Sequence, residues 1–132
     1  MKALDTNVLI RFLVRDEEKQ ARTVYESFKK AEAEKYVFFV PLLVVLEAIW
    51  VLEAVYAINR SDLLDAINEL LLMPILQFEA QTAIRKFLSS GYESNIDLPD
   101  LLIAYSAETA GCDCVLTFDR KASRHDLCEL IR

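Results

Sequence analysis

The apolar positions of this chain fall into short strand-like runs separated by longer stretches with helical spacing. The short runs are rich in aromatic and β-branched residues, whereas the longer stretches repeat an apolar residue every three or four positions. Strands are predicted at residues 1–4, 36–40, 75–78, 113–117 and 128–131. Helices are predicted at 8–14, from 16 onward, at 42–58, from 59–62 to 73, at 79–89, and from 97 to about 111, with a break at Ser90 and Gly91.

Strand and helix alternate along the whole chain, a pattern typical of the α/β class with a mostly parallel sheet. We expect a three-layer α/β/α sandwich built on four or five strands. The chain has only two glycines and three prolines and no internal repeat, so long flexible linkers are not expected. Residues 1–132 are therefore predicted to form a single domain.

One carboxylate stands out in the predicted helix 42–58, where the residues are apolar almost all round. Glu47 is the only charged residue between Lys35 and Glu53. A buried carboxylate is costly unless a cation, hydrogen-bond donors or an ion pair compensates for the lost water. Glu47 is therefore predicted to be a metal ligand or, alternatively, half of a structural ion pair.

Other acidic residues are predicted at strand ends or helix starts. Asp5 follows the first strand, Asp119 follows the fourth, and Asp97 and Asp100 stand at the start of a helix. Ligands of parallel sheets bind at the carboxyl ends of the strands. Each residue also has a structural interpretation as a helix cap or a turn residue. For the pair Asp97 and Asp100, the sequence favours Asp97 as the cap and Asp100 as the surplus carboxylate.

A cluster of these carboxylates would need a cation. Bringing two of them to about 4 Å costs on the order of 4 kcal/mol at an effective dielectric of 20. Mg²⁺ or Mn²⁺ fits oxygen donors, whereas the histidine and cysteine pattern disfavours zinc. His125 is the only histidine and is predicted to be a surface residue near a helix end. Cys112, Cys114 and Cys128 are predicted to be buried, reduced thiols.

The net charge of −6 makes general attraction to nucleic acid weak. Either phosphate is met locally, by metal ions and a few basic residues, or nucleic acid is not the substrate. Nearby basic residues that could bind phosphate, or form ordinary salt bridges, are Arg11, Arg120, Lys121 and Arg124. No secretion signal or long apolar run is present, so we expect a soluble, cytoplasmic protein without a membrane span.

Four segments, 4–10, 46–52, 97–104 and 115–120, resemble in order and spacing those of the PIN-domain family, and most closely its VapC-type toxins. The resemblance implies a PIN-like fold and a Mg²⁺- or Mn²⁺-dependent endoribonuclease that hydrolyses RNA. It also implies the toxin of a type II toxin–antitoxin pair, inhibited by a small cognate antitoxin protein. DNA would be contacted only through that antitoxin, and family members are usually homodimers.

The resemblance assigns roles by position. Asp5 and Asp100 would be the principal metal ligands, Glu47 would bind the metal directly or through water, and Asp119 would complete the catalytic pocket. Thr6 or Thr117 could orient a ligand or water. The main competing hypothesis is a non-catalytic protein-binding module, in which the acidic cluster is structural and the apolar helix positions form an interface.

Overall fold

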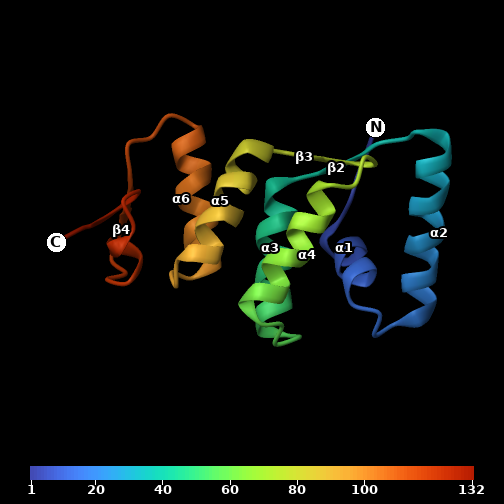
Figure 1. The fold of residues 1–132 in the computed structure, drawn as a ribbon, viewed down its shortest axis with the longest axis horizontal. Helices are drawn as coiled ribbons and strands as arrows, with labels where there is room; N and C mark the ends of the chain where they lie inside the picture. The colour runs from blue at the N-terminus through green and yellow to red at the C-terminus, as the bar shows by residue number, and fades with distance from the viewer. The chain divides into compact units, whose positions relative to one another are not determined.

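The computed structural model describes residues 1–132 and contains six α-helices and five short strands (Figure 1). A pair of α-helices separates each of the first three strands from the next. The chain divides into two compact units, Met1–Glu79 and Ala80–Arg132. All of the strand pairs are parallel, so the predicted α/β class is confirmed. The strands are β1 (Lys2–Ala3), β2 (Phe38–Val40), β3 (Leu76–Phe78), β4 (Val115–Thr117) and β5 (Cys128–Leu130). The helices are α1 (Thr6–Leu13), α2 (Glu18–Glu34), α3 (Leu42–Ala54), α4 (Arg60–Leu71), α5 (Gln81–Glu93) and α6 (Leu98–Thr109).

The first unit is built on a three-stranded sheet in the order β1-β2-β3. The Leu4 N–H donates to the Phe39 carbonyl at 2.9 Å, and the Glu79 N–H donates to the Val40 carbonyl at 3.0 Å, so the ladder extends past the strand ends. Helix α1 packs on α2 and α3, and α3 packs on α4. Because β1 and β2 are parallel, α1 and α3 both begin at the same edge of the sheet.

The second unit consists of α5 packed on α6 and a two-stranded sheet formed by β4 and β5 (Figure 1). Its core includes Phe87, Leu98 and Leu101, each fully buried. A short 3₁₀ helix, η1 (Ala122–Arg124), links the two strands. The five strands therefore pair as three and two. That residues 1–132 form a single domain, with all the strands in one sheet between two layers of helices, stays a prediction.

Two local expectations were wrong. The predicted break at Ser90 and Gly91 does not occur, because α5 continues to Glu93 and Gly91 is buried within it. Packing outweighs the roughly 1 kcal/mol that a glycine costs inside a helix. The cysteines are free, as predicted, but they are not buried: Cys112 is exposed, and Cys114 and Cys128 are only partly covered. None of the helices combines the length and apolar character needed to cross a bilayer.

Candidate acidic site

Asp5 stands where β1 ends and α1 begins, as the sequence predicts. Its Oδ1 accepts a hydrogen bond from the Thr6 N–H at 2.8 Å, so the side chain caps α1. The residue is exposed, whereas Thr6 behind it is buried. Asp5 therefore performs the capping role that the sequence left open, and one carboxylate oxygen is held by backbone at the carboxyl edge of the sheet.

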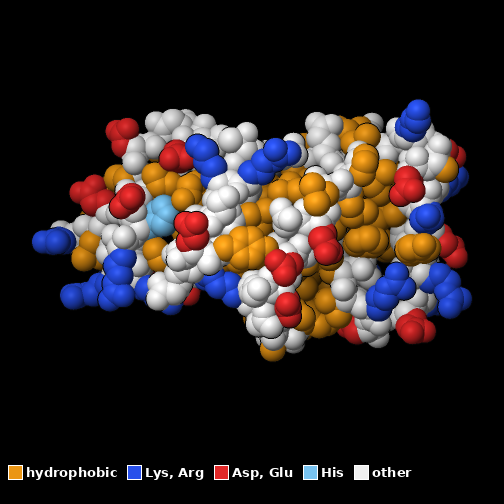
Figure 2. Space-filling view, in the orientation of Figure 1, with side chains coloured by type: hydrophobic (Ala, Val, Ile, Leu, Met, Phe, Trp, Pro, Cys, Tyr) orange, Lys and Arg blue, Asp and Glu red, His pale blue; other side chains and the backbone are white.

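Glu47 lies on α3, but its expected burial is wrong. The side chain is exposed, on the same helical stripe as Leu43 and Trp50, which are 77% and 60% exposed. The opposite side of α3 packs into the core through residues such as Ile49. Glu47 thus keeps its water, and the argument from desolvation does not apply to it. On the face drawn in Figure 2, hydrophobic side chains reach the surface over the helices of this unit.

Glu79, which the sequence predicts only as the start of a helix, positions α3. Its Oε1 accepts the Leu42 N–H at 2.8 Å. Pro41 precedes Leu42 and has no side chain that could cap the helix. The Glu79 carboxylate, directly after β3, therefore caps the helix that carries Glu47. The only sequence signal for this role was an acidic residue directly after a buried strand.

In the second unit, Asp97 and Asp119 lie close enough to Asp100 to act on it electrostatically. Burial raises the pKa of the Asp100 carboxyl above its usual 3.8, and the charges of Asp119 and Asp97 raise it further. Asp97 occupies the N-cap position of α6 without a capping hydrogen bond from its side chain. It forms an ion pair with Lys121 at 3.6 Å instead. Asp100 is thus the carboxylate of the pair without a basic partner.

Asp119 is fixed by the turn that follows β4. Its Oδ1 accepts the Ala122 N–H at 2.9 Å, and its own N–H donates to the Thr117 Oγ1 at 3.0 Å. These bonds confirm the structural role of a turn aspartate, and they restrict the position of its side chain. Thr117 acts on Asp119 through its backbone. Burial raises the pKa of the Cys128 thiol, and the charge of Asp100 raises it further.

The basic residues divide into engaged and unengaged ones. Arg11 donates to Gln20 at 2.7 Å and pairs with Asp16 at 3.6 Å, and Lys121 pairs with Asp97. Arg120 and Arg124 are exposed and form no ion pair. These two arginines are therefore the cations most available to a phosphate in this part of the chain.

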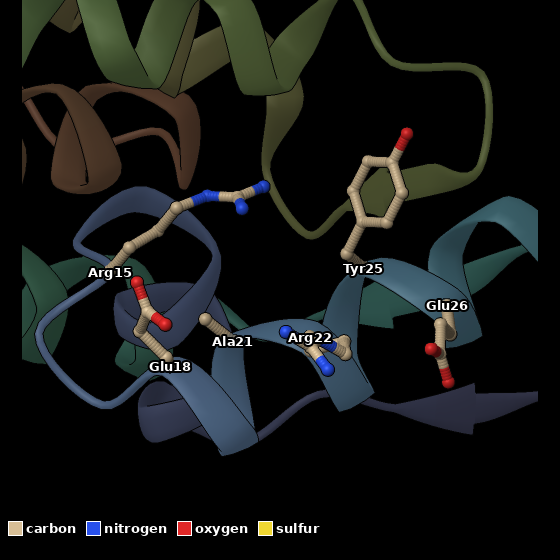
Figure 3. A pocket seen from close by; sticks show the side chains of 6 residues that line it. All are labelled: Arg15, Glu18, Ala21, Arg22, Tyr25 and Glu26. Carbon is tan, nitrogen blue, oxygen red and sulfur yellow. The ribbon is translucent and has the colours of Figure 1, made fainter.

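A cleft of about 360 Å³ lies on α2 in the first unit (Figure 3). Arg15 extends from the connection before α2 toward the Tyr25 ring, and its guanidinium lies 5.6 Å from the ring centre. The charges lining this cleft balance, with Arg22 and two glutamates beside Arg15. None of the predicted site residues lines it, so it provides no support for catalysis.

The predicted carboxylates are thus shared between the units: Asp5 and Glu47 belong to the first, and Asp100 and Asp119 belong to the second. No group of three or more histidine, cysteine or acidic side chains is arranged to hold a metal ion. The donor chemistry nevertheless fits a hard cation, because every predicted ligand is a carboxylate and the charges around Asp100 are only partly compensated.

Two comparisons with known proteins extend this description. The family model of the PIN domain matches residues 2–127, a range that includes all four predicted carboxylates and most of each unit. The "VapC ribonuclease" of Aquifex aeolicus (strain VF5) is 29% identical over 121 residues, which cover 92% of this chain and 89% of that protein. The similarity thus extends over nearly the full length of each chain.

Proposed function

Because this chain belongs to the PIN-domain family, we propose that it is a divalent-metal-dependent endoribonuclease. The family resemblance expected from the sequence is confirmed, and the distant similarity to a VapC ribonuclease supports a nuclease activity. The observation that carries the proposal is the acidic group in the second unit, where burial and then the charges of Asp119 and Asp97 raise the pKa of Asp100. A carboxyl whose pKa is raised by burial and by neighbouring like charges is a candidate functional group.

The carboxylates proposed to hold Mg²⁺ or Mn²⁺ are those of Asp5, Glu47, Asp100 and Asp119. A bound divalent ion would lower the pKa of a bound water and stabilise the charge that develops on a phosphodiester. Backbone N–H groups already orient two of the carboxylates, Thr6 for Asp5 and Ala122 for Asp119. Carboxylates that the backbone already orients cost less free energy to arrange when the substrate binds.

Arg120 and Arg124 are proposed to contact RNA phosphates. Both are exposed and follow Asp119 closely in the chain. An acidic site loaded with divalent ions would also present positive charge, which is compatible with RNA binding despite a net charge of −6. The attraction would be local, and moderate salt would weaken the contacts made by the arginines.

The biological role is proposed by analogy. We propose that the protein is a cytoplasmic, homodimeric toxin of a type II pair, that its partner is a cognate antitoxin protein, and that it reaches DNA only through that antitoxin. The similarity to a VapC ribonuclease supports this role. One observation favours the alternative, a non-catalytic binding module: α3 exposes Leu43 and Trp50, large apolar side chains suited to a protein contact.

The test uses the purified protein and a mixture of cellular RNA with Mg²⁺ or Mn²⁺. We expect cleavage that EDTA stops and excess metal restores. Asp100→Asn should abolish it, whereas Asp113→Asn, the same change at an exposed aspartate outside the acidic group, should not. Absence of cleavage by the wild type would favour the binding module, and equal cleavage by both variants would contradict the site.

A further inference from the structure

A second group of polar side chains lines an open cleft in the second unit. The cleft has a volume of about 640 Å³, within the usual range of small-ligand sites. One wall is formed by residues 92–96, from the end of α5 and the connection to α6. The other is formed by residues 124–126, the last residue of η1 and the two that follow it. None of the four predicted metal ligands belongs to either wall.

Both walls continue directly into the acidic group. The first wall ends at Ile96, the residue before Asp97. The second begins at the last residue of η1, and the first residue of η1 donates its N–H to the Asp119 carboxylate. The Lys121 and Asp97 ion pair joins the two segments. A molecule bound in the cleft would therefore lie near the acidic group of the second unit.

The cleft has an aromatic side chain on each wall. Tyr92 is 51% exposed on the first wall. On the second, the Nε2 of His125 lies 3.2 Å from the Tyr105 hydroxyl and 3.3 Å from the Ser90 hydroxyl. Its Nδ1 accepts the Leu127 N–H at 3.1 Å, so the neutral ring carries its hydrogen on Nε2. His125 lies near a helix end, as predicted, but it is a fixed part of the wall.

The charges of the cleft indicate what it can bind. Two carboxylates, Glu93 and Asp126, line it together with a single guanidinium, Arg124. Neither carboxylate forms an ion pair. This balance disfavours a phosphate and favours a neutral, flat group that donates hydrogen bonds. Guanine meets that description, because its N1–H and 2-amino groups are adjacent donors for one carboxylate, whereas uracil has no amino group.

We infer that this cleft binds a guanine base of single-stranded RNA. Tyr92 stacks on the base, and the carboxylates of Glu93 and Asp126 accept hydrogen bonds from its Watson–Crick edge. Aromatic stacking combined with edge recognition is the usual way in which proteins read unpaired RNA. The choice of RNA as the ligand rests on the proposed function, and the cleft would select the nucleotide beside the cleaved bond.

The inference is tested by fluorescence anisotropy with the full chain in EDTA, which prevents metal-dependent cleavage. Three labelled octamers are compared: all uridine, uridine with one central guanosine, and uridine with one central inosine, which lacks the 2-amino group. We expect the guanosine octamer to bind at least about fivefold more tightly than the uridine octamer. Inosine should lose most of that gain.

Variants locate the preference. Tyr92→Ala should weaken binding of the guanosine octamer by at least about fivefold. The double variant Glu93→Gln, Asp126→Asn should bind guanosine and inosine octamers equally. Tyr25→Ala, at a partly exposed tyrosine in the first unit, is the matched control and should change neither. Thermal melts establish that each variant is folded, which the exposure of these side chains leads us to expect.

Equal affinity for the three octamers, or no binding of any, would overturn the inference. A guanosine preference that survives both cleft variants would overturn it too. The outcome is separate from that of the nuclease test. A guanosine preference in a protein that never cleaves RNA would support guanine binding in the cleft and contradict the proposed endoribonuclease activity. Cleavage without any guanosine preference would support the nuclease activity and contradict guanine binding.

Discussion

Substitutions of Asp5 separate its cap from its proposed role in catalysis. The Oδ1 of Asp5 accepts the Thr6 N–H at 2.8 Å, and α1 has no acidic residue in its first turn. Asp5→Ala removes both the cap and the only charge at this helix end, which should cost about 1–2 kcal/mol. For a chain of this length, that lowers Tm by roughly 3–8 °C. Asparagine caps about as well as aspartate, so Asp5→Asn should lose less than about 1 kcal/mol.

The two variants should nevertheless lose metal-dependent RNA cleavage equally, by at least about 100-fold, because neither keeps the carboxylate. Urea unfolding in EDTA measures the stability difference, and cleavage of mixed RNA with Mn²⁺ measures activity. Asp5→Asn with wild-type cleavage would refute the assignment of Asp5 to the site. Equal stability of the two variants would refute the capping argument.

Three further predictions concern the second unit and the metal. In EDTA at pH 7, Asp100→Asn should raise the free energy of unfolding, measured by urea titration, by less than about 1 kcal/mol. The sign follows from the raised pKa: protonated Asp100 favours the folded state below the usual pKa of 3.8, that contribution is lost as pH rises, and the advantage of asparagine should vanish near pH 3. Mn²⁺ at ten times its Kd should stabilise the wild type by about 1.4 kcal/mol, measured by thermal melting, and Asp100→Asn should lose this response. Phe87→Ala, which empties a fully buried position, should cost about 3–5 kcal/mol in urea unfolding.

Much of the fold follows from local patterning. The alternation of strand and helix predicted the element order, and β1 ends and α1 begins beside Asp5 as expected. Gly91 shows where local rules fail: a glycine is a weak helix former anywhere, but the packing of α5 that buries it is not visible in sequence. The sequence indicates a weak helix former at position 91. The tertiary packing of α5 decides that the backbone there stays helical.

The acidic site illustrates the same division. The spacing of Asp97 and Asp100 predicted that they share the start of a helix, but the partner of Asp97 is Lys121, far along the chain. That ion pair distinguishes the two carboxylates, and no local pattern predicts it. The burial of Glu47 was predicted wrongly because α3 is apolar on every side, so periodicity could not show which face meets solvent.

The exposed stripe of α3 would couple protein association to cation binding. Leu43 and Trp50 flank Glu47, one helical turn before it and nearly one after. Any protein surface that covered these two apolar side chains would also remove water from the carboxylate between them. The free-energy cost of removing this water would be smaller if a cation were already bound to Glu47. Association at α3 and cation binding at Glu47 would then be thermodynamically coupled, so that each strengthens the other by the same factor.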